Sequence, residues 1–168
     1  IAIIGYGIQG DAQANNLKDS GLKVVIGLKE GGSSWNKANN DGHEVMSVSE
    51  ACKKADIIHV LIPDMVQSKV YKDEIEPNIS EGNALAFSHA AAIYWGWIKA
   101  PDNVDVIMVA PKGPGSKVRE TYLDGFGTPS IVAVEQDKTG TAWDRTLGIA
   151  KGIGSARAGL IKTTFKEE

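Results

Sequence analysis

Three closely spaced glycines near the start of the chain, Gly5, Gly7 and Gly10, form a pattern that can hold the phosphates of a dinucleotide. Gly5 permits a tight turn, Gly7 has no Cβ to keep a pyrophosphate away from the backbone, and Gly10 lets a helix pack closely on a strand. The apolar run Ile1–Ile4 predicts a buried strand before them, and Asp11–Ser20 predicts a helix after them, with its first N–H groups facing the phosphates. This context favours dinucleotide binding over the alternative, a purely structural turn.

The loop Lys29–Ser34 predicts which dinucleotide the chain binds. An NAD site usually carries an acidic residue about twenty positions after the glycines, where it holds the ribose 2′-hydroxyl. An NADP site instead offers cations, hydroxyls and free backbone N–H groups to a 2′-phosphate. Glu30 lies close to the position of the acidic residue, but its side chain is expected to point away from that of Lys29. Besides Lys29, the loop holds four small residues suited to a phosphate: Gly31, Gly32, Ser33 and Ser34. The loop therefore favours NADP, and a solvated loop is the structural alternative.

Of the three histidines, only His89 is predicted to take part in chemistry, because it follows a predicted strand and precedes small residues that let a ligand approach. His43 is expected at a surface turn. His59, inside an apolar strand, is expected to be a core histidine with one hydrogen-bonded nitrogen. Lys112 lies in the loop Pro111–Gly115, whose prolines and glycines fix the backbone path. It can support an oxyanion or a phosphate, and a solvated lysine is the open alternative.

Length and composition point to one soluble globular domain over residues 1–168. Hydrophobic residues make up 42% of the chain and charged residues 23%, which are ordinary values. The net charge of −3, with no basic block, argues against nucleic acid as a partner. No apolar run approaches the roughly 18 residues of a membrane span, and no signal peptide is visible. Cys52 is the only cysteine, which suits the cytoplasm, and it is predicted to fill space in a helix.

The candidate residues lie between strands and helices that alternate along the chain. Strands are predicted at Ile1–Ile4, Leu22–Leu28, His43–Met46, Asp56–Ile62, Asn83–Phe87, Asp105–Ala110, Ser130–Val134 and Gly159–Thr163. Helices are predicted at Asp11–Ser20, from Trp35 with Ser34 as its cap, through Lys54 with Ser47 or Ser49 as its cap, and at Asp64–Glu76, Ser116–Asp124 and Gly140–Lys151. This alternation predicts an α/β fold, Rossmann-like and doubly wound, with a mainly parallel sheet and helices on both faces. Ligands in that fold bind beyond the C-terminal ends of the strands, where the glycine turn, His89 and Lys112 are all expected.

Longer stretches of the chain add a family resemblance. They are Gly5–Gly10, Ala12–Ala14, Asn16–Leu17, Asp56–Ile58, Leu61–Asp64, Ala84–His89, Val106–Gly115, Ala133–Asp137, Ala150–Gly154 and Thr163–Glu168. In these stretches the chain resembles the ketol-acid reductoisomerases, also called acetohydroxy acid isomeroreductases. The resemblance covers the whole chain. The sequences Ala-Pro-Lys-Gly-Pro-Gly at 110–115 and Thr-Thr-Phe-Lys-Glu-Glu at 163–168 are specific to that family.

The resemblance implies an enzyme of two domains that forms homo-oligomers. Its Rossmann-like N-terminal domain binds NADPH, and a helical C-terminal domain, absent from these 168 residues, supplies carboxylates for two Mg²⁺ ions. The substrates are 2-hydroxy-3-keto acids, 2-acetolactate or 2-aceto-2-hydroxybutyrate, which undergo an alkyl shift and then reduction by NADPH. This step serves the synthesis of valine, leucine and isoleucine.

The resemblance also assigns roles to individual positions. His89 would be the active-site histidine. The cofactor-binding residues would be Tyr6, Gly7, Ile8 and Gln9 at the pyrophosphate, Lys29, Gly32 and Ser34 with the adjacent Ser33 at the 2′-phosphate, Asp64, Met65, Val66 and Gln67 along the adenosine and ribose side, and Gly115 close to the cofactor. No residue of the chain is expected to hold the metal ions, and the final Glu167 and Glu168 are expected to form a solvated tail.

Four departures from the family pattern bear on these roles. Ile8 replaces a common serine and removes a phosphate ligand, and Asp11 puts a negative charge where histidine is usual. Lys29 replaces an arginine and loses its bidentate geometry. Ala90-Ala91 replaces the usual Gly-Phe after the active-site histidine, which predicts an altered local backbone.

Other interpretations of the chain stay open at this stage. One is a metal-independent NAD(P)-dependent dehydrogenase domain of the β-hydroxyacid type, and another is a nucleotide-binding module without chemistry. Both ends of the chain are abrupt, which predicts a fragment that binds NADPH but has no Mg²⁺-dependent turnover of its own. The aromatic run Tyr94–Trp97 is expected either to pack in the core or to form a docking surface.

Overall fold

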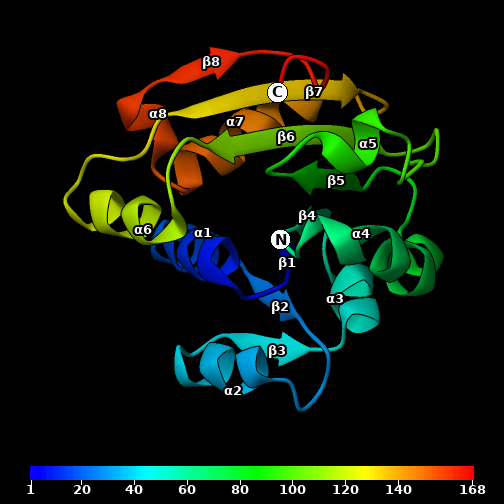
Figure 1. The fold of residues 1–168 in the computed structure, drawn as a ribbon, viewed down its shortest axis with the longest axis horizontal. Helices are drawn as coiled ribbons and strands as arrows, with labels where there is room; N and C mark the ends of the chain where they lie inside the picture. The colour runs from blue at the N-terminus through cyan, green and yellow to red at the C-terminus, as the bar shows by residue number, and fades with distance from the viewer.

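The computed structural model describes residues 1–168 as an eight-stranded sheet with helices packed on both faces (Figure 1). The strands are β1 (Ala2–Ile4), β2 (Val25–Gly27), β3 (Glu44–Met46), β4 (Ile57–Val60), β5 (Ala84–Phe87), β6 (Asp105–Pro111), β7 (Ser130–Gln136) and β8 (Leu160–Lys162). The helices are α1 (Ile8–Asp19), α2 (Ser33–Asn40), α3 (Val48–Lys54), α4 (Asp64–Val70), α5 (Ala91–Tyr94), α6 (Gly115–Leu123), α7 (Ala142–Gly152) and α8 (Ser155–Ala158). The predicted α/β fold is confirmed.

The strand order of the sheet places a binding crevice beside β1. The order is β3-β2-β1-β4-β5-β6-β7-β8, and the first six strands are parallel. Because β1 pairs with β2 on one side and with β4 on the other, the direction of winding reverses there. Such a switch point opens a crevice beyond the C-terminal ends of the strands. β7 is antiparallel to β6, and β8 is parallel to β7, an arrangement that the sequence pattern did not indicate.

Side chains alternate between two cores, one on each face of the sheet. On one face Ile4, Ile58 and Phe87 belong to a cluster that includes residues of α3. On the other face Ile3 and Ile107 belong to a cluster that includes residues of α1 and α7. Both faces of the central strands are buried, which explains why these strands appear in the sequence as continuous apolar runs.

The helix starts that bear on the glycine turn and on the loop after β2 differ from the prediction. The first helix begins at Ile8 rather than after Gly10, with Gly7 as its N-cap. The second begins at Ser33 with Gly32 as its N-cap, so Ser34 does not cap it as predicted. Glycine is tolerated at an N-cap because the residue there has a non-helical backbone. Both starts therefore bring backbone N–H groups closer to the preceding strand ends.

The remaining caps and breaks follow local chemistry. Ser47 caps α3 as predicted, and Glu50 completes a capping box by accepting a hydrogen bond from the Ser47 N–H at 3.1 Å. The helix predicted over Asp64–Glu76 is shorter, because α4 passes at Tyr71–Ile75 into a π-helical turn and then into a 3-10 turn at Glu76–Asn78. Tyr71 and Ile75 are both buried there, so packing overrides the α-helical pattern. None of the helices combines the length and the apolar surface that spanning a bilayer requires.

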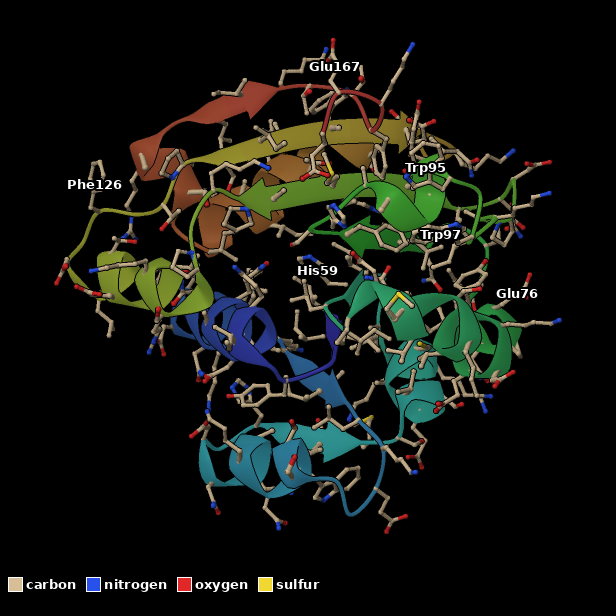
Figure 2. The ribbon with its side chains drawn as sticks, in the orientation of Figure 1. His59, Glu76, Trp95, Trp97, Phe126 and Glu167 are labelled. Atoms are coloured by element: carbon tan, nitrogen blue, oxygen red, sulfur yellow. The ribbon has the colours of Figure 1, made fainter.

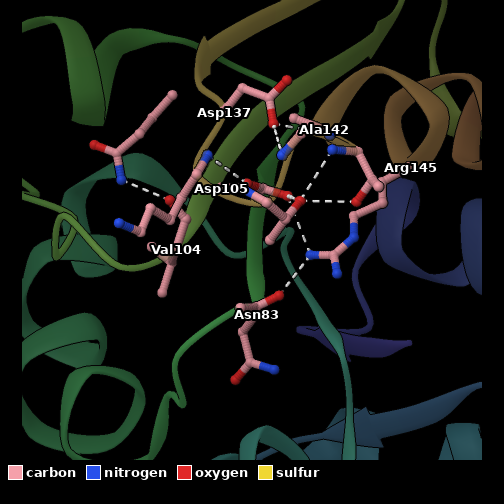
Figure 3. A network of polar contacts seen from close by, with 12 residues as sticks. Asn83, Val104, Asp105, Asp137, Ala142 and Arg145 are labelled. Atoms are coloured by element: carbon pink, nitrogen blue, oxygen red, sulfur yellow. Dashed lines mark hydrogen bonds and ion pairs between the residues drawn. The ribbon is translucent and has the colours of Figure 1, made fainter.

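A buried carboxylate fixes the edge of the sheet where the strands begin (Figure 3). Oδ1 of Asp105, at the start of β6, accepts hydrogen bonds from the backbone N–H groups of Lys138 at 2.8 Å and Thr139 at 2.9 Å. Its Oδ2 accepts one from the Thr139 hydroxyl at 2.7 Å and one from the Arg145 guanidinium at 3.2 Å. Arg145 also donates to the carbonyl oxygen of Gly82 at 2.7 Å. The network joins the loop before α7 to the start of two strands.

Candidate functional site

The glycine turn has the geometry that its spacing predicts. Gly5 has φ +100°, which only glycine adopts without strain, so the turn requires it. A Cβ on Gly10 would lie 2.3 Å from the carbonyl oxygen of Gly5, so α1 can approach β1 only with glycine there. A Cβ on Gly7 would meet nothing within 4 Å, so this backbone faces open space. The turn thus combines two glycines that packing requires with one that lies open beside the N-terminus of α1.

Side chains of the turn point in three different directions. Tyr6 is buried, and its hydroxyl donates to Oδ2 of Asp41 at 2.9 Å, so only its backbone can face a phosphate. Burial raises the pKa of the Tyr6 hydroxyl, which stays neutral. Ile8 is 73% exposed at the first position of α1. Gln9 donates from Nε2 to the carbonyl oxygen of Gly113 at 2.9 Å and so connects the turn to the loop after β6.

Gly115 closes the turn from the side of α6. A Cβ on this residue would lie 2.1 Å from the carbonyl oxygen of Ile8, so the N-terminus of α6 approaches the turn as closely as the backbone allows. A cleft of about 290 Å³ lies there, lined by Ile8, Asp11, Ala12, Gly115, Ser116 and Arg119. The structure therefore places Gly115 beside the glycine turn, although more than a hundred residues separate them.

The loop after β2 presents unpaired polar groups to solvent. The side chains of Lys29, Ser33 and Ser34 form no hydrogen bond and no ion pair within the chain. Ser33 and Ser34 are the first two residues of α2, whose first N–H groups have no partner inside the helix. Glu30 is exposed in the same loop. Cationic, hydroxyl and N–H groups are thus free at the strand end where the sequence predicts a 2′-phosphate.

His89 lies at the end of β5 and contacts a carboxylate from the neighbouring strand end. Its Nδ1 lies 2.8 Å from Oδ2 of Asp64, the first residue of α4. Lys112, after β6, lies 3.1 Å from Oε1 of Glu168, and Oε2 of Glu168 lies 4.0 Å from Nε2 of His89. Two carboxylates thus lie beside the histidine, and the lysine pairs with one of them. The predicted placement of His89 and Lys112 at one edge of the sheet is confirmed.

The prediction of a solvated tail is wrong for Glu168. Its side chain is only 5% exposed, and Oε2 accepts a hydrogen bond from the backbone N–H of Ala90 at 2.9 Å. The Ala90 N–H and the Lys112 ammonium group satisfy both carboxylate oxygens, which makes its burial possible. Glu167 is exposed, in agreement with the prediction. The only signal in the sequence was that Lys112 and Glu168 both lie in family-specific stretches.

The segment Asp64–Gln67 contributes one buried amide to a second cleft. Gln67 donates from Nε2 to the carbonyl oxygen of Ile62 and to Oδ1 of Asp64, both at 2.9 Å. Its Oε1 is buried and has no partner. Met65 and Val66 are exposed, at 92% and 44%. The cleft has about 160 Å³ and is lined by Gln9, Val60, Leu61, Ile62, Asp64, Gln67, Ser88 and His89. It adjoins both the glycine turn and the histidine.

Of the other candidate side chains, one differs from its predicted environment and two agree with it. His43 was expected at a surface turn but is buried, with Nε2 at 3.1 Å from Oδ1 of Asn15, and burial lowers its pKa. His59 is fully buried with one bonded nitrogen, as predicted, and burial lowers its pKa to about 4. Cys52 is buried in α3, and burial raises the pKa of its thiol to about 12, so it is a packing residue.

Three further observations concern parts of the structure other than the clefts at the glycine turn. No group of three or more His, Cys, Asp or Glu side chains is arranged to hold a metal ion. A cavity of about 670 Å³ lies near the C-terminal ends of α1, α6 and α7, and none of the candidate site residues lines it. Trp95 and Trp97 are 65% and 50% exposed (Figure 2), so of the two alternatives that the sequence left open, packing in the core does not hold for them.

Comparison with known proteins relates the whole chain to one enzyme family. Residues 1–159 match the family model described as acetohydroxy acid isomeroreductase, NADPH-binding domain. The chain is 80% identical to a ketol-acid reductoisomerase (NADP(+)) of Cenarchaeum symbiosum and 81% identical to that of Nitrosopumilus maritimus. In each case all 168 residues align and cover 51% of the relative, so the chain spans about half the length of these proteins.

Solved structures give the same answer for the fold. A structure of an NADH-preferring ketol-acid reductoisomerase from an uncultured archaeon superposes with a TM-score of 0.97 at 47% identity, over 99% of this chain and 52% of that one. An NAD-binding semialdehyde dehydrogenase from Cupriavidus necator superposes with a TM-score of 0.79 at 21% identity, over 99% of this chain and 63% of that one, which shows the fold alone. The resemblance seen in the sequence is confirmed, and the chain belongs to the NADPH-binding domain family of the acetohydroxy acid isomeroreductases.

Proposed function

We propose that this chain binds NADPH and forms the dinucleotide-binding part of a ketol-acid reductoisomerase. The proposal rests on one observation above all. The open glycine turn, the free Lys29–Ser34 loop and His89 lie along one edge of the sheet, in a chain 80% identical to enzymes named for NADP(+). The substrates of the whole protein would be 2-acetolactate or 2-aceto-2-hydroxybutyrate, in the synthesis of branched-chain amino acids. The single buried cysteine fits a cytoplasmic protein.

The residues present fit the dinucleotide along its length. The backbone of Gly7, Ile8 and Gln9, at the open N-terminus of α1, would hold the pyrophosphate. Gly5 and Gly10 shape that turn, and Gly115 approaches it from α6. Lys29, Ser33 and Ser34, with Gly32 at the N-cap of α2, would hold the 2′-phosphate. Asp64 and Gln67, with the backbone of Met65 and Val66, would border a ribose, because the buried Oε1 of Gln67 is free to accept a hydroxyl hydrogen.

His89 is the proposed catalytic residue of this half of the enzyme. Asp64 accepts the Nδ1 hydrogen, which orients the ring and leaves Nε2 on the side of Glu168, the partner of Lys112. In that orientation Nε2 can accept a proton from, or donate one to, a substrate oxygen. NADPH, when bound, supplies the hydride for the reduction. The part that we propose for this chain in the reaction is therefore cofactor binding and proton handling.

The choice of NADPH over NADH rests on the loop after β2. The free Lys29, Ser33 and Ser34 favour a phosphate, whereas the exposed Glu30 opposes one. The named relatives at 80% identity are NADP(+) enzymes, and the solved relative at 47% identity is described as NADH-preferring. Lysine holds a phosphate as a point charge rather than by a bidentate fork, which predicts a moderate preference.

The test is the ratio of the Kd values for NADPH and NADH, measured by fluorescence titration of the purified chain. We expect NADPH to bind more tightly, and Lys29→Ala to raise its Kd by about tenfold while the Kd for NADH changes by less than about twofold. Lys53→Ala is the matched control, because Lys53 is an exposed lysine without an ion pair on α3. Tighter binding of NADH by the unmodified chain would overturn the assignment.

The same chain tests how far its activity extends. Because it offers no metal site, we expect NADPH binding without Mg²⁺-dependent turnover of 2-acetolactate. Stopped assays with and without Mg²⁺ would measure this directly. Turnover by the chain alone would mean that its own residues complete the reaction, contrary to the proposal.

A further inference from the structure

A network of buried polar side chains lies beneath the cleft beside the glycine turn. His59, in the middle of β4, lies between helix α1 and the sheet (Figure 2) and places Nε2 at 3.2 Å from Oγ of Ser88. Nε2 of Gln13, in α1, lies 3.2 Å from the same Oγ and 3.1 Å from Oε1 of Gln9. His59 and Gln13 are both fully buried. Polar groups in such a place require a reason, because their burial costs free energy.

The positions of the hydrogen atoms in this hydrogen-bond network can be assigned from its geometry. The Ser88 hydroxyl donates its one hydrogen to the carbonyl oxygen of Val109 at 2.7 Å, so Oγ can only accept from its other two neighbours. Nε2 of His59 therefore carries a hydrogen, and because burial lowers the pKa of the ring to about 4, Nδ1 carries none near neutral pH. The two hydrogens of the Gln13 amide go to Ser88 and Gln9. Every hydrogen bond of this network thus has one direction, and none of these side chains can rotate without breaking a bond.

The hydrogen-bond network ends at the loops that form the candidate site. Gln9, held through its Oε1, donates from Nε2 to the carbonyl oxygen of Gly113 in the loop after β6. Ser88 is held through Oγ and directly precedes His89. The network therefore fixes the first turn of α1, the end of β5 and the loop after β6 relative to one another.

The network leaves two buried acceptors without a partner, Nδ1 of His59 and Oε1 of Gln13. An apolar pair of similar size would avoid that cost in a merely structural position. The place of the network in the sheet indicates which part of the ligand it serves. The pyrophosphate would cross at β1, the Lys29–Ser34 loop lies beyond β2, and the network lies on the other side, beneath β4 and β5.

We infer that His59 and Gln13 are positioning residues for the nicotinamide half of the dinucleotide, acting through Ser88 and Gln9. The inference rests on the proposed function, since it takes NADPH as the ligand. It separates the site into two parts. The adenosine half depends on the loop after β2, and the nicotinamide half depends on the buried network.

The experiment compares two ligands on the same variants of the 168-residue chain. NADPH occupies both halves of the site, whereas 2′,5′-ADP carries only the adenosine half with its 2′-phosphate. His59→Met removes the donor to Ser88, and His59→Gln keeps an N–H donor near the position of Nε2. We expect His59→Met to raise the Kd for NADPH by about tenfold and to change the Kd for 2′,5′-ADP by less than about twofold. His59→Gln should bind NADPH within about threefold of the unmodified chain.

Gln13→Leu supplies a second arm from a different element. It removes both donated bonds, so the same selective loss of NADPH affinity is expected. Thr146→Val is the control for a buried polar loss elsewhere, because Thr146 is fully buried in α7 and bonds only to the carbonyl oxygen of Ala142. It should leave both Kd values unchanged even where the melting temperature falls.

The outcomes distinguish the inference from the proposed function. Parallel losses for NADPH and 2′,5′-ADP in His59→Met and Gln13→Leu, or no loss for either ligand, would show the network to be structural and would overturn the inference. Failure of His59→Gln to restore NADPH binding while it restores the melting temperature would also overturn it. Failure of the unmodified chain to bind both ligands would instead overturn the proposed function, on which the inference rests.

Discussion

Two buried polar networks lie at opposite ends of the same sheet and are built differently. At the start of β6, four donors satisfy both carboxylate oxygens of Asp105 (Figure 3). Beneath the ends of β4 and β5, His59 and Gln13 are just as deeply buried, but each keeps one polar atom without a partner. Gln67, at the rim of the cleft, also keeps one. Three of the four buried side-chain atoms without a partner thus lie at the end of the sheet where ligands bind, and the fourth, Nδ1 of His43, lies just before the start of β3.

This difference separates stabilising residues from binding residues within one fold. A buried carboxylate with all its hydrogen bonds made holds backbone segments together and has no capacity left for a ligand. A partly satisfied network costs stability, and it persists where the remaining atoms serve another purpose. Substitutions in the first network should change stability alone, and substitutions in the second should change binding.

The largest expected effect is that of Asp105→Ala on stability. The substitution leaves the N–H groups of Lys138 and Thr139 and the guanidinium of Arg145 without their buried acceptor. We expect the free energy of unfolding in urea to fall by about 4 kcal/mol, while the Kd for NADPH of the folded protein stays within about twofold. The proposed difference between the two networks is contradicted if Asp105→Ala weakens NADPH binding by as much free energy as it removes from folding.

Asp137→Ala is the matched control for this change. Oδ1 of Asp137 accepts from the N–H groups of Gly140 and Ala142 close to the same loop. Because Asp137 is an exposed loop residue whose hydrogen bonds are made with backbone N–H groups, its loss should cost only about 1 kcal/mol. An equal cost for the two aspartates would mean that burial of Asp105 adds nothing.

The next effect is the pH dependence of stability that His59 causes. Its pKa is about 4 in the folded chain and 6.5 ordinarily, so the unfolded chain takes up a proton that the folded chain refuses. Its contribution is complete above pH 6.5 and is lost as the pH falls toward 4, by about 3 kcal/mol in total. His43, with a lowered pKa, adds to the loss in the same direction. Urea unfolding between pH 4 and 7 measures it.

His59→Gln removes the titrating group but keeps the donor to Ser88. Its unfolding free energy should therefore fall less steeply with acid than that of the unmodified chain, with the remainder due to His43 and the carboxylates. An unchanged slope would mean that His59 accepts a proton without leaving its buried position. That result would contradict the lowered pKa of the buried His59 ring.

The order of strands and helices could be predicted because it depends on local pattern. Buried parallel strands appear as short apolar runs, and Ser47 and Glu50 mark a helix start by themselves. The antiparallel β7 could not be predicted, because strand direction depends on which edge a segment joins. The π-helical turn at Tyr71–Ile75 depends on both side chains being buried by neighbours that the local sequence does not show.

The part of the site that a single turn forms could be predicted from the sequence. The part that forms where distant segments meet could not. Gly5, Gly7 and Gly10 define the turn within six residues. Glu168, by contrast, is buried by Lys112, 56 positions away, and by Ala90, 78 positions away. Its identity alone indicates only a charged residue near the end of the chain. A prediction of its role requires knowing that β5 and β6 end side by side.

A smaller effect separates packing from binding inside the glycine turn itself. Gly10→Ala places a Cβ 2.3 Å from the Gly5 carbonyl oxygen and should lower the unfolding free energy by about 2 kcal/mol. Gly7→Ala meets no atom within 4 Å and has an ordinary φ of −81°, so stability should change by less than about 0.5 kcal/mol. Its methyl group would instead stand where the pyrophosphate is proposed, so its Kd for NADPH should rise. Equal stability of the two variants would contradict the assignment.

The smallest effect concerns Lys37, which neutralises a carboxylate beside the proposed pyrophosphate position. Its Nζ lies 2.7 Å from Oδ2 of Asp11 and 2.8 Å from Oδ2 of Asp41, and the hydrogen bond with Asp11 is the main cause of its raised pKa. Lys37→Met would leave Asp11 unpaired at the N-terminus of α1. Because the lysine is 51% exposed, we expect the Kd for NADPH to rise only about threefold at low salt and less at high salt.

A double-mutant cycle shows whether Lys37 acts through Asp11 or directly on the cofactor. In the Asp11→Asn background the carboxylate charge is already gone, so Lys37→Met should have almost no further effect on the Kd. Asp11→Asn alone should bind NADPH slightly more tightly than the unmodified chain, since it removes a negative charge near the phosphates. If Lys37→Met weakens binding equally in both backgrounds, the lysine contacts the cofactor itself. The Asp11–Lys37 pair would then belong with the binding residues rather than with the satisfied networks.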